Sequence, residues 1–212
     1  SGDRVISVVP TYQQHYSIPA SIGAQVTTLR LREEDQFLPD LDRLRELATG
    51  ETKLIAFTNP NNPTGALIEQ PMLEKIVEIA DAADAYLLCD EVYRGTAQVG
   101  DGMVPSIADM YRKGISTAGM SKVFSLAGLR LGWVAAPQDV TEKIMIHRDY
   151  DTISVGMLND HFAAIALENA DNVLSRSRQI TRENLAILEE WINNEPRVSW
   201  VKPRAGTTAM LK

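Results

Sequence analysis

The side chain best suited to covalent chemistry lies in a stretch of small residues, "STAGMSKVFSLAGLRLGW", at positions 116–133. Lys122 is the lysine of this stretch, and Arg130 follows it eight positions later. An amine forms an imine with a carbonyl compound when part of it is deprotonated near neutral pH. A guanidinium binds phosphate in a bidentate geometry that an ammonium does not offer. The spacing predicts a reactive lysine that is held beside an anionic ligand.

Three further segments carry polar side chains that suit a ligand. Tyr12 lies in "VVPTYQQHY", and Asp90 and Tyr93 lie in "LLCDEVYRG". The segment "FTNPNNPTG" contains Asn62 and predicts a rigid turn, because two prolines fix φ and a glycine permits a positive φ. Taken alone, this turn is also consistent with an ordinary loop. Asp90, taken alone, is equally consistent with a helix cap or a turn residue.

Each of these segments follows a short apolar or β-branched run that predicts a strand. The runs lack regular polar alternation, so we expect strands covered on both faces; they span residues 5–9, 25–31, 53–58, 86–89, 115–118 and 132–136. Segments with helical periodicity lie between several of these runs. One is a short helix with Asp40 as its N-cap, and another helix starts near Pro71. This alternation predicts an α/β fold with a mostly parallel sheet, in which ligands bind at the carboxyl ends of the strands.

The chain after Pro137 is predicted to be mainly helical, and from Arg197 it turns extended again. We therefore expect a large domain over residues 1–170, and a long linking helix with the start of a smaller C-terminal domain over residues 171–212. Both ends resemble interrupted extended stretches, so we expect the chain to be a fragment. The last predicted helix carries Leu185, Leu188 and Ile192 on one face, with Ile187 and Trp191 beside them. This pattern predicts an apolar stripe that is buried against the protein, with a partner-binding face as the alternative.

Composition excludes several classes of protein. The net charge is -7, with 28 acidic residues against 21 lysines and arginines, which argues against a nucleic-acid partner. The single cysteine, Cys89, excludes an internal disulfide and is expected to be buried in a strand. No apolar run approaches the roughly 20 residues of a membrane span, and no signal-peptide pattern opens the chain. We expect a cytoplasmic protein with a small-molecule partner.

The histidines do not have the spacing of a metal site. His15, His147 and His161 are each expected to be surface or packing residues. His15 alone lies in one of the four ligand segments, so a supporting role there stays open. The sequence predicts no bound metal.

The order of the motifs is more specific than any one of them. The chain has, in this order, an asparagine turn, a strand followed by Asp-x-x-Tyr, a Ser-Lys pair and the motif Gly-Leu-Arg-Leu-Gly. This order resembles that of the class I/II aminotransferases. These are aspartate aminotransferase-like enzymes of fold type I that use pyridoxal 5'-phosphate (PLP). The resemblance extends from "GDRVISVVPTY" to "KPRAGTT", nearly the whole chain. It implies the large domain of that fold, a mostly parallel sheet with helices on both faces, followed by the start of a smaller domain.

The resemblance assigns the two central catalytic roles. It implies that Lys122 forms the Schiff base with PLP and then moves a proton between the substrate α-carbon and the cofactor. Asp90 would pair with the pyridine nitrogen and keep it protonated, so that the ring accepts the electrons released with the α-proton.

The same resemblance assigns the contacts that hold the cofactor. Tyr93 and Asn62 would donate hydrogen bonds to the phenolic oxygen of PLP, Tyr93 being also a catalytic residue. Arg130 would bind the phosphate, and Tyr12 would stack on the face of the ring.

One position departs from the family pattern. Many members have a serine three positions before the lysine as a phosphate ligand, and this chain has Gly119 there. Ser121 is nearer, but it would point elsewhere if the local backbone were extended. We therefore expect the phosphate to depend more on Arg130 and on backbone amides.

The function that the resemblance implies is transfer of an amino group between an amino acid and a 2-oxo acid. Two alternatives stay open: another PLP enzyme on the same scaffold, such as a carbon-sulfur β-lyase or a cyclising synthase, or a PLP-binding sensor domain without catalysis. Members of the family are usually homodimers. Their glycine-containing phosphate loop and substrate-carboxylate arginine lie outside the segment that this chain matches, so we expect the chain alone to be inactive and the full-length protein to be a homodimer.

Overall fold

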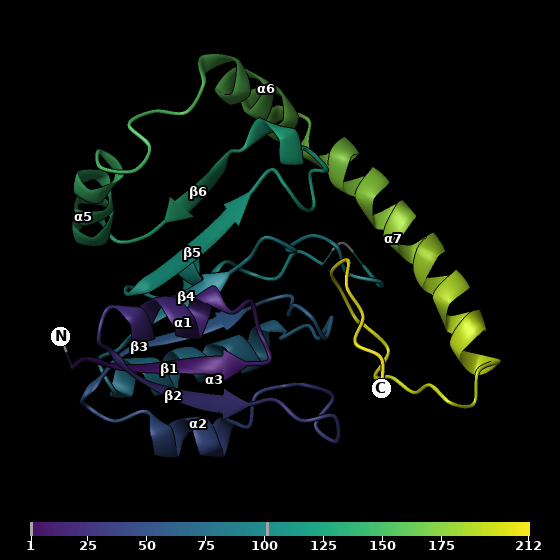
Figure 1. Ribbon diagram of the computed structural model, residues 1–212, viewed down its shortest axis with the longest axis horizontal. Helices are drawn as coiled ribbons and strands as arrows, with labels where there is room; N and C mark the ends of the chain where they lie inside the picture. The colour runs from purple at the N-terminus through teal and green to yellow at the C-terminus, as the bar shows by residue number, and fades with distance from the viewer. Residues whose placement is uncertain (1, 101) are drawn as a thin grey trace.

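One mostly parallel sheet forms the centre of the computed structural model, which describes residues 2–100 and 102–212 (Figure 1). Its strand order is β2-β1-β3-β4-β5-β6; β1 to β5 run parallel, and β6 is antiparallel to β5. The predicted α/β architecture is confirmed, and the ends of every predicted strand lie within one residue of the observed ends. The strands are β1 (Arg4–Val9), β2 (Gln25–Arg30), β3 (Thr52–Thr58), β4 (Tyr86–Asp90), β5 (Gly114–Gly119) and β6 (Gly132–Ala135).

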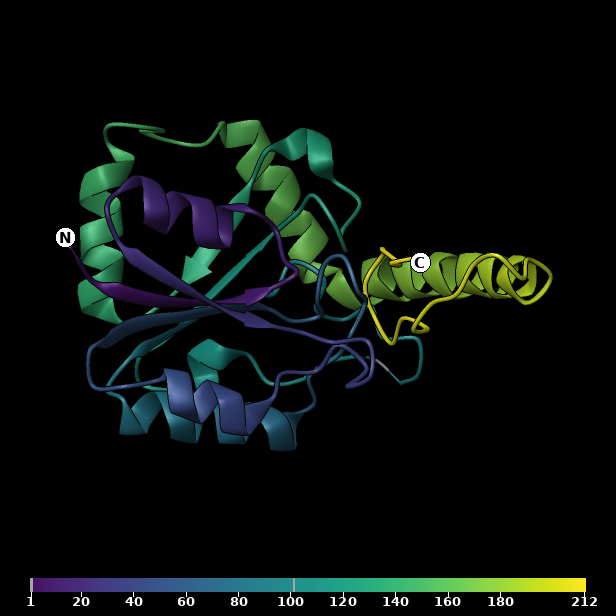
Figure 2. The same cartoon turned by 60° about the horizontal axis from the view of Figure 1, so that its bottom comes forward.

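Helices lie on both faces of the sheet (Figure 2). Helix α1 (Gln14–Ser21) covers one face, whereas α2 (Leu41–Leu47), α3 (Gln70–Ala82) and α4 (Ile107–Met110) cover the other. Asp40 caps α2 as predicted, since its carboxylate accepts the backbone N–H groups of Asp42 at 3.0 Å and Arg43 at 2.9 Å. Pro71 lies in the first turn of α3, where no intrahelical N–H bond is lost.

The main core lies between the central strands and α3. Ile55, Phe57 and Leu87 of the strands are buried, and they share one apolar cluster with Leu73 and Ile76 of α3. Burying an apolar side chain of this size contributes about 1.5–3 kcal/mol. This packing holds β3 and β4 in place and therefore fixes the loops at their carboxyl ends.

The two outer strands differ from the prediction. All four residues of β6 are exposed, and Leu29 is the buried residue of β2. Cover on both faces was therefore wrong for these two strands. Each has one strand neighbour in the described sheet, so less of its surface is shielded than that of a central strand.

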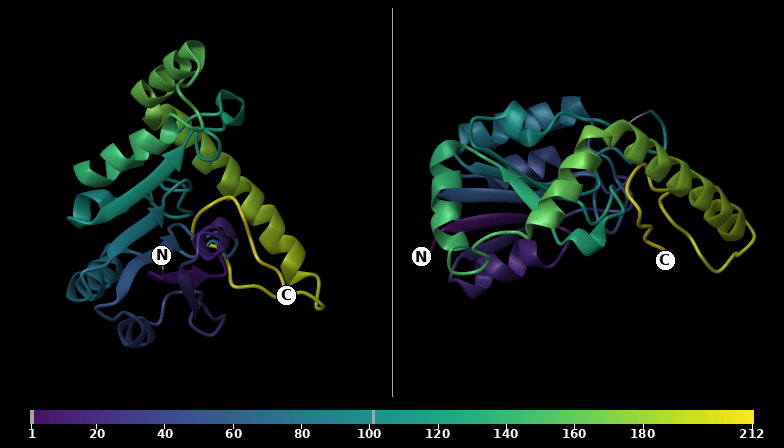
Figure 3. Two further views of the ribbon diagram at one scale, coloured as in Figure 1. Left: turned by 60° about the vertical axis from the view of Figure 1, so that its left-hand side comes forward. Right: turned by 90° about the horizontal axis from the view of Figure 1, so that it is seen from above.

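The chain after β6 is helical, as predicted. It forms α5 (Gln138–Arg148), α6 (Met157–Glu168) and α7 (Ala170–Asn193), and α7 leads away from the sheet (Figure 3). The predicted apolar stripe of α7 is only partly buried: Ile192 is buried and Leu185 and Leu188 are half-buried, but Ile187 is 67% exposed and Trp191 49%. The expectation of a buried stripe is therefore confirmed only in part.

The segment after α7 returns toward the sheet (Figure 1). Ser199 and Lys212 exchange backbone hydrogen bonds, and Trp200 and Leu211 form an isolated antiparallel bridge. The extended stretch predicted from Arg197 is thus a loop closed by one bridge, and residues 203–206 within it touch the loops that follow β3 and β4. Among the described helices, none combines the length and the apolar character that a membrane span requires.

Candidate active site

The four predicted ligand segments meet at one edge of the sheet. Thr58 pairs in register with Asp90, and Asp90 with Thr117, so the ends of β3, β4 and β5 lie side by side. The hydroxyls of Thr11 and Thr58 are 2.9 Å apart, which ties the segment after β1 to the end of β3. This is the position at which an open parallel sheet binds its ligand.

Asp90 is half-buried, and one of its two carboxylate oxygens is held by the protein. Its Oδ1 accepts the backbone N–H of Val92 at 3.2 Å and the hydroxyl of Thr117 at 3.5 Å. Burial raises the pKa of Asp90; the Val92 N–H, the charge of His15, the Thr117 hydroxyl and the charge of Lys122 oppose that rise. Within the described residues Oδ2 makes no hydrogen bond, so it is available to a ligand.

His15 of α1 lies beside this carboxylate. Its Nδ1 atom is buried and has no hydrogen-bond partner in the described part of the chain. Burial lowers the pKa of His15, and the negative charge of Asp90 opposes the shift. The supporting role that the sequence left open for His15 thus has a structural basis, and its only signal there was its place in the segment after the first strand.

Lys122 lies in a turn whose backbone is anchored on both sides. Met120 donates its backbone N–H to Leu131 at 3.0 Å and accepts that of Leu126 at 2.9 Å. Met120 and Val123 are buried in a second apolar cluster, whereas the side chain of Lys122 is exposed. The turn therefore holds the backbone still and leaves the amine free, close enough for its charge to act on Asp90.

Arg130 follows the short 3-10 helix η1 (Ala127–Leu129) in a left-handed conformation, with φ of 49°. One nitrogen of its guanidinium donates to the carbonyl of Ala127 at 2.8 Å, and the side chain is exposed. Its remaining N–H groups make no hydrogen bond with the described residues and are available to an anion. Ser121 is in the turn and not in extended backbone, so the condition on which we expected its hydroxyl to point elsewhere is not met.

The structure explains the glycine at position 119. A Cβ atom there would lie 3.1 Å from the carbonyl oxygen of Leu131 and 3.2 Å from the Cα of Gly132, where β5 and β6 approach each other. Any side chain would crowd this contact. Glycine at this position therefore suits the close approach of β5 and β6.

The asparagine turn uses two of its amides internally and leaves one free. Asn59 donates to the carbonyl of Ile68 and accepts its N–H, both at 2.9 Å. Asn61 donates to the carbonyl of Pro10 at 3.3 Å and accepts the hydroxyl of Thr64 at 2.7 Å. Asn62, half-buried, makes no side-chain hydrogen bond with the described residues, so the structure distinguishes it from its two neighbours.

The two tyrosines of the site have different environments. Tyr93 is 3% exposed and packs with Met120 and Val123, in the same cluster that anchors the lysine turn. Tyr12 is 51% exposed and offers a free ring face. The first is fixed by packing, and the second is available for stacking.

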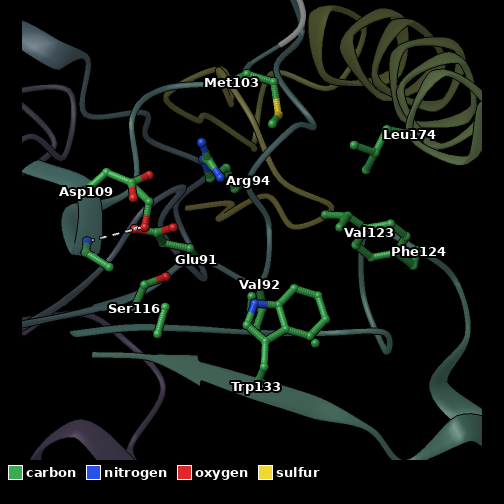
Figure 4. A pocket seen from close by; sticks show the side chains of 15 residues that line it. Glu91, Val92, Arg94, Met103, Asp109, Ser116, Val123, Phe124, Trp133 and Leu174 are labelled. Atoms are coloured by element: carbon green, nitrogen blue, oxygen red, sulfur yellow. Dashed lines mark hydrogen bonds between the residues drawn. The ribbon is translucent and has the colours of Figure 1, made fainter. Parts of the chain in front are cut away.

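A separate cavity of about 270 Å³ is lined by Glu91, Ser116 and Trp133, among others (Figure 4). Ser116 and Ala118 line it, and they alternate along β5 with Thr117, which contacts Asp90. The buried carboxylate of Glu91 at this cavity accepts the N–H of Ile107 at 2.8 Å and the hydroxyl of Ser106 at 3.1 Å. Glu91 therefore supports the start of α4, although it adjoins Asp90 in the sequence.

Cys89, His147 and His161 are residues that the sequence did not assign to the site. Cys89 is buried as predicted, and burial raises the pKa of its thiol well above the usual value. His147 and His161 are exposed. No group of three or more potential metal ligands occurs in residues 2–100 and 102–212.

Comparison with known proteins identifies the family. The family model "Aminotransferase class I and II" matches residues 1–208, and the chain belongs to this family. The fold is therefore that of the fold type I enzymes, a family that uses PLP.

Individual relatives agree with this assignment. Capreomycidine synthase of Streptomyces vinaceus is 31% identical over 208 residues, 98% of this chain and 53% of that protein. Aromatic-amino-acid aminotransferase 2 of Thermococcus litoralis is 30% identical, over 95% of this chain and 53% of the relative. The crystal structure of a PLP-dependent aminotransferase from Streptococcus suis superposes with a TM-score of 0.94 at 47% identity, covering 100% of this chain and 56% of that one. The chain spans about half the length of the relatives it matches.

The described side chains fit PLP. Five groups lie on the segments at this sheet edge: the carboxylate of Asp90 with one free oxygen, the amine of Lys122, the amide of Asn62, the guanidinium of Arg130 and the ring of Tyr12. These groups match, in turn, the pyridine nitrogen, the aldehyde, the phenolic oxygen, the phosphate and the ring face of the cofactor.

Proposed function

We propose that the chain is the cofactor-binding part of a PLP-dependent aminotransferase that moves an amino group between an amino acid and a 2-oxo acid. One observation carries the proposal: Asp90 keeps a free carboxylate oxygen within reach of the charge of Lys122, at the carboxyl end of the sheet. A pyridine ring with an aldehyde beside it needs these two groups at its opposite ends. PLP, when bound, supplies the electron sink for the carbanion chemistry.

In this proposal the chain's residues orient the ring and move one proton. The Oδ2 atom of Asp90 would accept a hydrogen bond from the protonated pyridine nitrogen, while Val92 and Thr117 hold the other oxygen. The Nζ atom of Lys122 holds the cofactor and afterwards carries the proton from the substrate α-carbon. Tyr93 and Asn62 donate to the phenolic oxygen.

In this proposal exposed side chains bind the phosphate and cover the ring face of the cofactor. Arg130 keeps one nitrogen on Ala127, which orients its guanidinium, and turns its other N–H groups to the phosphate. Tyr12 covers the ring. Ser121, in the turn beside Lys122, is a second candidate for the phosphate.

A cyclising synthase is the second candidate, because the relative named capreomycidine synthase is 31% identical over 98% of the chain. The same Lys122 and Asp90 would serve it, since groups around the substrate decide the fate of the carbanion. The two candidates differ in their product. A transaminase releases a 2-oxo acid and leaves the cofactor in its amine form, whereas a cyclase leaves the cofactor as an aldehyde.

The test is a screen of amino acids against the full-length, PLP-loaded protein, followed by the absorption spectrum of the cofactor. Conversion of the cofactor to its amine form, restored by a 2-oxo acid, is the expected result. A cyclised product, or a 2-oxo acid released together with a thiol, would replace transamination with cyclase or β-lyase chemistry. A protein that binds no PLP would overturn the proposal altogether.

We further propose a homodimer, with the division into residues 1–170 and 171–212 that the sequence predicts and a cytoplasmic location. Large apolar side chains that are exposed between α5 and α6 support the dimer; they include Ile146, Tyr150, Ile153, Met157 and Leu158. Single apolar residues are ordinary on a surface, but several exposed within one short segment are what an interface would cover. Sedimentation of the full-length protein tests this, and a monomer at micromolar concentration would contradict it.

A further inference from the structure

Residues 203–206, which we call the strap, join two loops of the candidate site. On one side the strap holds the asparagine turn. The carbonyl of Gly65, three residues after Asn62, accepts the N–H of Arg204 at 2.8 Å and that of Ala205 at 3.0 Å. The guanidinium of Arg204 also pairs with Glu69, which lies beyond the same turn.

On its other side the strap holds the loop that carries Tyr93. Gly206 donates its N–H to the hydroxyl of Thr96 at 3.1 Å, and this hydroxyl in turn donates to the carbonyl of Tyr93. Gln98 donates its backbone N–H to the carbonyl of Arg204 at 2.9 Å. Thr96 is fully buried, so the chain of hydrogen bonds is shielded from water.

The strap packs tightly against the turn. Ala205 is fully buried and shares an apolar cluster with Leu67 and Ala97. A Cβ atom on Gly65 would lie 2.5 Å from the Cβ of Pro203, and Gly65 has φ of 70°. The turn therefore needs glycine at this position both for its conformation and for the strap to approach. Such a contact leaves no room for the two loops to shift independently.

We propose that the strap sets the separation of Asn62 and Tyr93, and that Thr96 and Gly206 are positioning residues for the two donors to the phenolic oxygen of the cofactor. The inference rests on the proposed function, because it assigns that oxygen to these two side chains. Hydrogen bonds to a phenolate stabilise its ionised form, and a donor displaced by a few tenths of an ångström loses part of its strength. A loosened strap would therefore make the bound cofactor harder to deprotonate.

The experiment measures the pH midpoint of the colour change of PLP bound to the full-length protein. Thr96→Val keeps the shape of the side chain but removes the hydroxyl that links Tyr93 to Gly206. Losing a net hydrogen bond of about 0.5–1.5 kcal/mol corresponds to a rise of the midpoint by about half a pH unit to one unit. PLP affinity, measured by equilibrium dialysis, is expected to fall severalfold.

Three further variants separate positioning from general destabilisation. Thr96→Ser keeps the hydroxyl and should restore the parent midpoint. Gly206→Ala adds a Cβ 3.9 Å from the Cγ of Tyr93, at a residue with φ of 81°, and should raise the midpoint even if Thr96→Val fails to fold. Lys202→Met breaks the exposed pair with Glu189 just before the strap and should leave the midpoint unchanged.

The outcomes distinguish the two levels of inference. If the parent protein forms no coloured complex with PLP, the proposed function fails and the strap's role fails with it. If the parent binds PLP but Thr96→Val or Gly206→Ala, folded, titrates like Lys202→Met, the proposed function stands and the strap inference is wrong.

Discussion

The two halves of the candidate site are built in opposite ways. In the asparagine half, formed by the loops after β1, β3 and β4, the loops after β3 and β4 are largely buried, and Asn59, Asn61 and Thr96 form hydrogen bonds with nearby backbone groups. The lysine half, residues 119–133, presents Lys122 and Arg130 to solvent from a backbone that is anchored by Met120. A rigid wall can orient a ring, whereas a reactive amine must be free to meet its partner. The difference assigns recognition to the first half and chemistry to the second.

The largest effect is expected at the lysine. Lys122→Ala should abolish covalent attachment of PLP and lower turnover by several orders of magnitude, because Lys122 is the lysine whose charge acts on Asp90. Borohydride reduction followed by peptide mapping measures the attachment. Lys143→Ala, which breaks an exposed pair with Asp139, is the matched control and should be labelled normally. Labelling at another lysine would remove Lys122 from its role.

Replacing the carboxylate should separate function from stability. Asp90→Asn should retain part of the PLP binding but lower turnover by several orders of magnitude, since the pyridine nitrogen loses its anionic partner. Burial raises the pKa of Asp90, so ionising it costs folding free energy above that pKa, and the amide should unfold at equal or higher denaturant at pH 7.

Asp81→Asn, which changes an exposed residue paired with Arg112, provides the comparison for both measurements. Near-normal turnover in Asp90→Asn would show that the carboxylate does not serve the ring.

A substitution in the asparagine half should affect stability first. Asn59→Ala leaves both the N–H and the carbonyl of buried Ile68 without a partner, which should lower the free energy of unfolding by about 2–4 kcal/mol. Ser121→Ala, in the lysine half, should change it by less than about 0.5 kcal/mol. Urea denaturation of the two variants measures the contrast, and equal values would contradict the division of the site into a rigid and an open half.

The smallest expected effect concerns pH. Burial lowers the pKa of His15 below 6.5, so the unfolded chain binds its proton more tightly, and stability falls as the pH drops below about 6.5. In His15→Phe this part of the pH dependence should disappear, a change of at most about 1.4 kcal/mol between pH 7.5 and pH 5.5. His147→Phe, at an exposed histidine of α5, should keep it. An unchanged slope in His15→Phe would place the titration elsewhere.

Local patterns made much of the architecture predictable. Apolar runs identified the six strands because central strands such as β3 and β4 are covered on both faces, and Asp40 and Pro71 marked helix starts through interactions within a few residues. The same reasoning misjudged β6 and part of the stripe of α7, because cover depends on what packs against an element. No local pattern reports that.

The sequence by itself determined the order of strands and helices, the polar segments that follow the strands, and the family. Tertiary structure alone decided which asparagine stays free, how little space surrounds position 119, that His15 lies beside Asp90, and that residues 203–206 bridge two loops. The physical reason is the range of the interactions. Periodicity and capping act over a few residues, whereas the allocation of buried hydrogen bonds and the space for a Cβ atom depend on groups that are distant in the chain.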